Sequence, residues 1–155
     1  MKDLDINILK KHPVFAAFHG HEDFDVLDGY VQRVKLNAGD SLFKEGEKGN
    51  FLSFILNGNL DIIKHSIHKK SVKVASLRQG MSVGEMSIID QLRRSATVTA
   101  SIPTELIELP KEQFDALLEA HHALGIKLLK GVARSMSLSL RRASNRLADS
   151  LPPIV

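Results

Sequence analysis

A succession of short β-prone runs, separated by turn residues, constrains the fold of this 155-residue chain most strongly. Between Tyr30 and Pro110, apolar and β-branched residues gather in short runs, and Gly, Asn or Asp stands between them. Turn signals at intervals of about 8 to 12 residues are typical of short antiparallel strands in a sandwich or barrel. We therefore expect an all-β middle segment. Its runs read VQRVKL, SLF, FLSFIL, NLDIIK, VKVASL and ATVTA.

Asn57-Gly58 lies between two of these runs and is the strongest hairpin signal in the chain. A type I′ turn requires positive φ at both central residues, and Asn and Gly adopt that conformation with least strain. The sequence therefore predicts a hairpin that joins the strand before Asn57 to the strand after Gly58.

The segments on both sides of the β-rich middle have helical patterns. Apolar residues from Leu4 to Leu27 have helix-like spacing, but Pro13 interrupts it because proline lacks an N–H donor. We expect two or three short helices in this segment. After Pro110, the pattern predicts one short helix and then a long helix from His121 to about Ser150.

The long helix has apolar residues in an unbroken 3-4-3-4 spacing, which is typical of a coiled-coil seam. Two of the seven seam positions are small alanines, which weaken an isolated coil. We therefore expect the seam to pack partly on the β-rich segment and partly on a second copy. The seam residues are Ile126, Leu129, Ala133, Met136, Leu140, Ala143 and Leu147.

Composition excludes several classes of protein. There is no cysteine, which excludes disulfides and thiolate chemistry. The apolar runs are too short for a transmembrane helix, and the N-terminus lacks the apolar core of a signal peptide, so we expect a cytoplasmic protein without a membrane segment. The net charge of +3 comes largely from basic residues spread along the last helix, which indicates a solvated face rather than a nucleic-acid platform.

No residue pattern predicts an enzyme or a metal centre. The histidines include three close pairs, at 19 and 21, 65 and 68, and 121 and 122, but none has the three or four convergent ligands of a zinc site. We find no nucleophile paired with His and Asp, and no carboxylate pair in the context of a hydrolase. We therefore expect no catalysis, no metal ion and no cofactor.

The stretch from Val83 to Ala100, VGEMSIIDQLRRSATVTA, combines groups suited to a sugar phosphate. Gly84 allows close approach of the backbone, and the first N–H groups of a short helix have no partner within that helix. An arginine such as Arg94 supplies a forked donor that matches phosphate, whereas ionised Glu85 can only accept. One site would therefore offer donors to a phosphate and an acceptor to a ribose hydroxyl.

This spacing resembles the phosphate-binding cassette of cyclic nucleotide-binding domains, the family of the catabolite activator protein, kinase regulatory subunits and cyclic-nucleotide-gated channels. The resemblance implies that Glu85 binds the ribose 2′-hydroxyl and Arg94 the exocyclic phosphate oxygens. Backbone N–H groups near Met86 and Ser87, and at Ser95, would complete the phosphate cradle. The implied ligand-binding residues are Gly84, Glu85, Met86, Ser87, Arg94, Ser95 and Ala96.

The resemblance extends from Pro13 to about Leu147, because KHPVFAAF and AGDSLFKEGEKGNFLSFILNG also follow the family pattern. Four positions depart from the family pattern. Val83 replaces the usual Phe, and Arg93 stands where a proline or small residue is common. Asn50 replaces an Asp, and Ser53 replaces a frequent aromatic residue. We interpret Arg93 as a solvated neighbour of the site. A hydroxyl at position 95 is associated with guanine preference, but serine leaves the base open.

We therefore predict a mainly β protein with flanking helices, an antiparallel β-roll of the jelly-roll type. Its one structural domain would comprise N-terminal helices at 1–29, the roll at 30–110 with a short cassette helix in 83–98, and C-terminal helices at 111–150. The implied function is a cyclic nucleotide sensor, for cAMP or cGMP, which converts binding into movement of its last helix. That helix would act as the lid, read the base and form a homodimer.

One alternative is an interaction module of the same fold that binds a protein partner without a nucleotide, and the substitutions at 50, 53 and 83 favour it. A downstream protein partner fits either interpretation. We do not expect DNA binding, because eight residues after Leu147 are too few for a helix-turn-helix.

Overall fold

The computed structural model describes residues 3–68 and 70–154, so that residues 1 and 2, the start of the predicted helical segment, lie outside it. Three short elements precede the strands: helix α1 (Asp3–Leu9), the 3-10 helix η1 (Pro13–Phe15) and helix α2 (Glu22–Asp28). Helix α1 ends four residues before Pro13, and the His12 side chain caps η1 by accepting the Val14 N–H.

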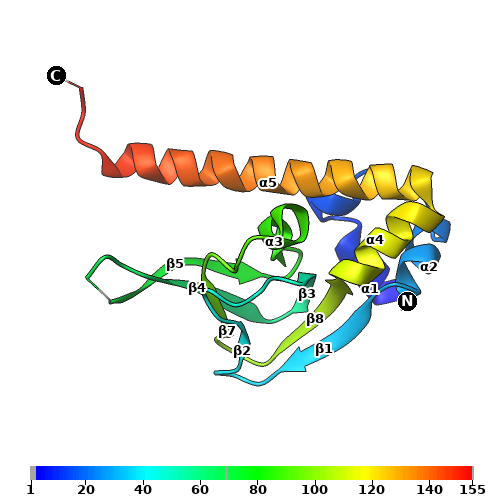
Figure 1. Ribbon diagram of the computed structural model, residues 1–155, viewed down its shortest axis with the longest axis horizontal. Coiled ribbons are helices and arrows are strands. Elements are labelled where there is room, and N and C mark those ends of the chain that lie inside the picture. The colour runs from blue at the N-terminus through cyan, green and yellow to red at the C-terminus, as the bar shows by residue number, and fades with distance from the viewer. Residues whose placement is uncertain (1–2, 69, 155) are drawn as a thin grey trace.

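The strands of the described residues form two four-stranded antiparallel sheets, with strand orders β1-β8-β3-β6 and β2-β7-β4-β5. The two sheets form a roll (Figure 1), which confirms the predicted fold class. The strands are β1 (Gln32–Leu36), β2 (Ser41–Phe43), β3 (Phe51–Asn57), β4 (Asn59–His65), β5 (Ser71–Arg78), β6 (Ser82–Val83), β7 (Thr97–Ala100) and β8 (Thr104–Pro110).

The hairpin predicted at Asn57-Gly58 is wrong. Strand β3 pairs with β6 and β8, whereas β4 pairs with β5 and β7, so this turn carries the chain from one sheet to the other. Gly58 has a φ of 104°, and a Cβ there would lie 2.4 Å from the Thr104 hydroxyl oxygen. The turn before β8 approaches residue 58 so closely that only glycine fits there. This requirement comes from residues far along the chain, so the local sequence pattern does not reveal it.

Strand β3 lies between two hydrophobic clusters. Leu52 and Phe54 face the helices, where they pack with Phe15 and Phe24, while Ile55 faces the interior of the roll. This double burial explains why β3 is a nearly continuous apolar run instead of an alternating one.

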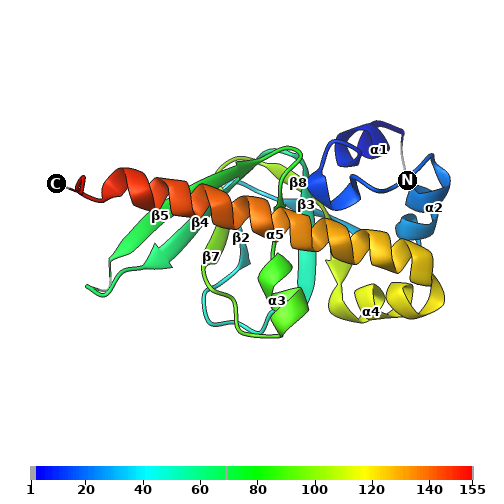
Figure 2. The ribbon, with the colours of Figure 1, turned by 90° about the horizontal axis from the view of Figure 1, so that it is seen from above.

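The C-terminal helices are α4 (Lys111–Ala120) and α5 (His122–Ser150), and α5 extends across the molecule above the roll (Figures 1 and 2). Its buried stripe differs from the predicted seam. It comprises Leu124, Gly125, Leu128, Gly131, Val132 and Ser135. Seam residues Ile126 and Leu147 are exposed instead. No helix in the described part of the chain is both long and apolar enough to cross a membrane.

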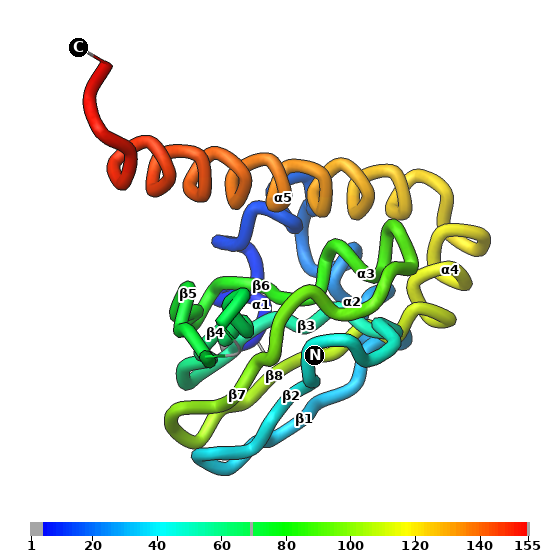
Figure 3. The backbone as a smooth tube through the Cα atoms, turned by 60° about the vertical axis from the view of Figure 1, so that its left-hand side comes forward, coloured from blue at the N-terminus to red at the C-terminus, as the bar shows by residue number. Residues whose placement is uncertain are grey.

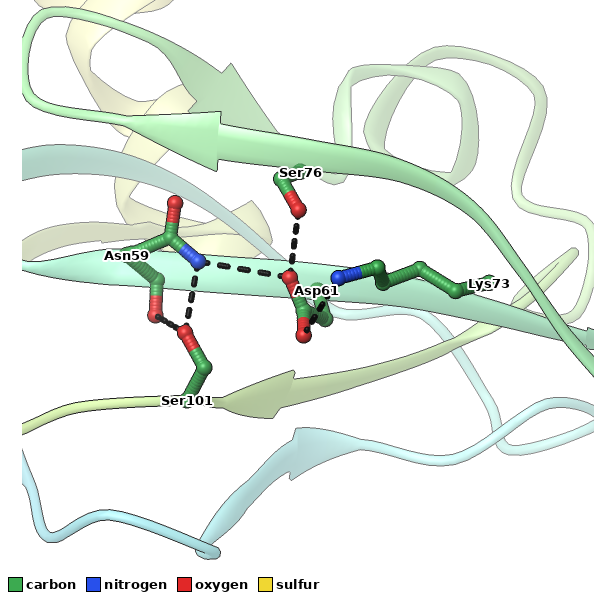
Figure 4. A network of polar contacts seen from close by, with 5 residues as sticks. All are labelled: Asn59, Asp61, Lys73, Ser76 and Ser101. Atoms are coloured by element: carbon green, nitrogen blue, oxygen red, sulfur yellow. Dashed lines mark hydrogen bonds and ion pairs between the residues drawn. The ribbon is translucent and has the colours of Figure 1, made fainter.

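A polar network stabilises the outer face of the second sheet (Figure 4). Asp61 of β4 accepts hydrogen bonds from Ser76 of β5 at 2.5 Å and from Asn59 at 3.3 Å, and it pairs with Lys73 at 3.5 Å. The bond from Ser76, followed by the other donors, holds the pKa of Asp61 below its ordinary value. Asn59 also donates to Ser101 at 2.6 Å, so the network links β4 to the end of β7.

The burial of His12 predicts a loss of stability in acid. Burial, with a smaller contribution from the charge of Arg142, lowers the pKa of His12 from 6.5 to about 4. Between these values the unfolded chain binds the proton and the folded protein does not, so stability falls as pH decreases. We expect His12 to remove about 2 kcal/mol from the free energy of unfolding between about pH 7.5 and pH 5.

Denaturant unfolding of wild type and His12→Asn at both pH values measures this effect. Asparagine keeps an acceptor for the Val14 N–H but does not titrate, so the variant should lose less stability than wild type. Equal losses in the two proteins would contradict the assignment to His12.

Gly131 allows α5 to lie directly on η1. A Cβ at this position would lie 1.8 Å from the Val14 carbonyl oxygen. Alanine normally stabilises a helix relative to glycine by about 1 kcal/mol, yet we expect Gly131→Ala to lower the free energy of unfolding by about 1–3 kcal/mol through overpacking. Urea unfolding, with the exposed Ser144→Ala on the same helix as control, tests this. If Gly131→Ala raised the free energy of unfolding instead, α5 and η1 would be able to move apart without loss of stability.

Candidate functional site

A cavity of about 560 Å³ lies between the second sheet, α3 (Glu85–Asp90) and α5. Figure 3 shows α3 between the strands and α5, and Figures 1 and 2 place it beside the middle of α5. The roll contributes apolar side chains to the wall, among them Phe43, Ile62, Leu77 and Val98. The volume lies within the range typical of pockets for small molecules.

All seven predicted binding residues line this cavity. They come from α3, from its N-cap and from the segment that precedes β7. Ser87 and Ala96 are buried, whereas Met86 and Ser95 are exposed. Residues 84–87 and 94–96, which are separated in sequence by the loop after α3, therefore meet at one wall.

Helix α5 contributes a second set of lining residues that the cassette pattern did not identify individually. They are Met136, Ser137, Ser139, Leu140 and Ala143. Three of them, Met136, Leu140 and Ala143, belong to the predicted seam, so part of that seam lines the cavity and does not belong to the buried stripe of α5.

Arg94 is the central charged group of the cavity. Only 3% of its surface is exposed, and Nη2 donates a hydrogen bond to the Phe51 carbonyl oxygen at 2.9 Å. Nε and Nη1 are buried and have no hydrogen-bond partner in the structure. Among residues 3–68 and 70–154, no ion pair joins Arg94 to a carboxylate. A buried cation with two unpaired donors is costly unless a further acceptor binds them.

Two aromatic rings enclose the guanidinium of Arg94. Its central carbon lies 3.9 Å from the centre of the Phe43 ring and 4.5 Å from that of Phe51, within the range of cation–π attraction. Burial lowers the pKa of Arg94, while the charges of Glu108, Glu47 and Glu85 oppose this effect. Arginine titrates so far above neutrality that the group stays a cation at pH 7.

The loop between β2 and β3 fixes the backbone of Arg94. The Arg94 N–H donates to the Glu47 carbonyl oxygen at 2.8 Å, and the Gly46 N–H donates to the Arg94 carbonyl oxygen at 2.9 Å. Arg93 points elsewhere: it is exposed, it does not line the cavity, and its Nη1 donates to the Gly46 carbonyl oxygen at 2.9 Å. Two adjacent arginines thus have separate roles, one in the cavity and one on the loop.

Two glycines allow the cassette to close around Arg94. Gly84 precedes α3 with a φ of 97°, and a Cβ there would lie 2.7 Å from Nη1 of Arg94. At Gly49 a Cβ would lie 2.1 Å from that of Ser87, so the loop before β3 contacts α3 directly. A side chain at either position would displace α3 or Arg94.

Glu85, the first residue of α3, is held by two hydroxyl groups. Ser82 donates a short hydrogen bond to its Oε1, and Ser135 of α5 donates to the same oxygen at 3.2 Å. The cassette is therefore linked directly to the long helix. In the described part of the chain, no group of three or more His, Cys, Asp or Glu side chains is arranged to hold a metal ion.

Comparison with known proteins agrees with this geometry. The family model of the cyclic nucleotide-binding domain matches residues 33–121, more than half of the chain. The fold is similar to a cyclic nucleotide-binding domain from Methylobacillus flagellatus KT, with a TM-score of 0.86 and 29% identity over 97% of this chain and 86% of that one. It is also similar to the catabolite activator protein of Thermus thermophilus, with a TM-score of 0.77 and 27% identity over 88% of this chain and 62% of that one.

Among curated proteins, the chain is similar to the lysophospholipase nte1 of Aspergillus fumigatus. The two are 31% identical over 110 residues, which are 71% of this chain but only 7% of that protein. The chain thus spans less than a tenth of the curated relatives it matches. The family predicted from the cassette is confirmed: the chain belongs to the cyclic nucleotide-binding domain family.

Proposed function

We propose that this protein is a regulatory domain, not an enzyme, that binds cAMP or cGMP in the cavity beside α3 and α5. The observation that supports this most is Arg94, a buried cation at the cavity wall with two unpaired donors. A bound phosphate would supply both acceptors for these donors and a negative charge in direct contact with the guanidinium. Family membership supports a cyclic nucleotide as the source of that phosphate.

The phosphate would bind to Nε or Nη1 of Arg94 and to backbone N–H groups of the cassette at Met86, Ser87 and Ser95. Each charge-assisted hydrogen bond contributes on the order of 1.5 to 3 kcal/mol. Three or four such bonds, less the cost of immobilising the ligand, are consistent with micromolar affinity, or about −8 kcal/mol.

The ribose would bind at Glu85, which lines the same cavity. Its Oε1 already accepts from two serines, while Oε2 has no hydrogen bond to any described residue. Oε2 is therefore the acceptor we assign to the 2′-hydroxyl.

The base would lie against α5, whose hydroxyls Ser137 and Ser139 line the cavity together with Leu140. Hydroxyls donate and accept, so they suit either adenine or guanine. Ser95 provides a further hydroxyl near the phosphate and does not decide between the two bases.

Binding would be reported by a change in the position of α5. This helix contacts the roll through Ser135, and its distal part contacts β5 where Arg146 donates to the Val74 carbonyl oxygen at 3.1 Å. A ligand that binds both α3 and α5 favours the arrangement in which the two lie together, which is a population shift. The altered helix would be the signal that a downstream protein partner recognises.

We also propose that exposed seam residues of α5 pair with a second copy. Ile126 is 54% exposed and Leu147 is 60% exposed, and neither lines the cavity. Apolar side chains spaced at 3-4 intervals on an exposed helix face are typical of helix pairing.

The first test of the proposal is titration calorimetry with cAMP and with cGMP. Wild type should bind at least one of them with a Kd on the order of micromolar. Arg94→Met should abolish binding because the phosphate loses its cation, whereas Arg93→Met, the adjacent control, should change affinity little. Without nucleotide, Arg94→Met should keep the free energy of unfolding within about 1 kcal/mol of wild type or raise it, because it removes a buried unpaired charge.

Absence of binding of both nucleotides to wild type at about 100 μM, a hundredfold above the expected Kd, would refute this function. The protein-interaction module predicted as the alternative would then be favoured. In that case, the oligomeric state and partner binding should not change when nucleotide is added.

A second test concerns the homodimer. Sedimentation velocity should show wild type as a dimer, and Ile126→Glu combined with Leu147→Glu should shift it to monomer because like charges would meet across the seam. Ser144→Glu, which adds one charge to the same helix outside the seam, should have a smaller effect. A monomeric wild type at concentrations of about 100 μM, where weak helix pairing would still be detected, would refute the pairing.

A further inference from the structure

Three side chains from three elements meet at one carboxylate oxygen. Ser82 of β6 and Ser135 of α5 both donate to Oε1 of Glu85, and the two hydroxyl oxygens lie 3.4 Å apart. We name this group the serine clamp: Ser82, Glu85 and Ser135. Both hydroxyls use their hydrogens on the same oxygen, so the clamp restricts the Glu85 side chain to one orientation.

The clamp joins two packed parts of the molecule, α5 and the first sheet. Ser135 is 5% exposed and lies one turn beyond Gly131, where α5 contacts η1. Ser82 precedes the glycine that caps α3, and it is opposite Phe54 in the first sheet. A movement of α5 that separates it from the roll must therefore remove one of the two donors from Glu85.

Ser135 does not line the cavity, although Ser82, Glu85 and Met136 do. It can therefore influence a ligand only through the other two clamp residues, Glu85 and Ser82, which do line the cavity. This separates Ser135 from the hydroxyls Ser137 and Ser139, which are placed to contact the ligand directly.

We propose that Ser135 is a positioning residue for the ribose, and that it makes discrimination of the 2′-hydroxyl depend on the position of α5. When α5 is docked, the serine clamp occupies Oε1 of Glu85 and leaves Oε2 for the 2′-hydroxyl. When α5 is displaced, Glu85 loses a donor and its orientation is no longer fixed. This inference rests on the proposed function, since it assigns the ribose to Glu85.

Linkage makes the coupling reciprocal. If a docked α5 improves ribose binding, then a bound ribose favours docking of α5 by the same factor. A cyclic nucleotide without the 2′-hydroxyl would still bind Arg94 through its phosphate, but it would favour docking less. The sugar, and not only the phosphate or the base, would then determine how strongly the ligand moves the helix.

The test compares the affinities of cAMP and 2′-deoxy-cAMP, and of cGMP and 2′-deoxy-cGMP, for wild type and variants. Wild type should prefer the ribonucleotide about tenfold to a hundredfold, the range expected for a hydrogen bond to a charged acceptor. Ser135→Ala should weaken the ribonucleotide about threefold to tenfold and the deoxynucleotide little, so that the preference shrinks by the same factor. Ser82→Ala should act in the same direction, and Ser135→Thr, which keeps the hydroxyl, should restore the preference.

Ser144→Ala, an exposed serine on the same helix, is the control for helix composition and should leave the preference unchanged. Hydrogen exchange of α5 with saturating ligand provides a second readout. In wild type the ribonucleotide should protect residues 132–143 more than the deoxynucleotide, and in Ser135→Ala this difference should be lost.

The outcomes separate this inference from the proposed function. If wild type binds a cyclic nucleotide and Ser135→Ala weakens both sugars equally, or leaves the preference intact, the positioning role is wrong while the proposed function stands. If wild type binds none of the four nucleotides, the proposed function fails and the role of Ser135 fails with it. If Ser135→Ala does not fold, Ser82→Ala decides, and an unchanged ribonucleotide preference in that variant would refute the clamp.

Discussion

The site depends on one interaction that the protein leaves incomplete: the guanidinium of Arg94 is buried with two unpaired donors, and no carboxylate among the described residues forms an ion pair with it. The rings of Phe43 and Phe51 and one backbone carbonyl compensate part of its desolvation. The loop before β3 holds the backbone of Arg94 in place from both sides. Much of the surrounding architecture thus maintains a costly charge in one position, which is the arrangement expected where a ligand supplies the missing acceptor.

The site also depends on helix α5, which packs on the core with one face and lines the cavity with another. Leu128 and Val132 bury one face against η1 and the core, and Gly131 allows that contact. The adjacent face, with Met136 and Leu140, closes the cavity. Under the proposed function, a helix that is held near its beginning and contacts the ligand farther along would change position about the held part. Ser135 lies where these two regions meet.

The sequence predicted those features that are encoded locally. Strand and helix patterns predicted the roll, and the spacing from Gly84 to Ala96 identified residues that the fold brings to one cavity. The prediction failed at Asn57-Gly58, because the need for glycine there comes from Thr104, far along the chain. Ser135 was not recognised either. A single serine in a helix forms no recognisable sequence pattern. The role of Ser135 becomes visible only through its hydrogen bond to Glu85, a carboxylate 50 residues away.

The charges around Arg94 also indicate how such a site would select its ligand. Glu108, Glu47 and Glu85 all act on this arginine, so the cavity is not a generally positive region that attracts every anion. An anion that enters the cavity also approaches Glu85, which lines it, and the attraction to Arg94 is correspondingly reduced. Binding must then come from short, directed hydrogen bonds to Arg94 and the cassette backbone, together with a hydroxyl for Glu85. A free phosphate satisfies only the first of these, whereas a ribose phosphate satisfies both. Under the proposed function, Glu85, which repels a simple anion, would therefore give a ribose phosphate a contact that a free phosphate lacks.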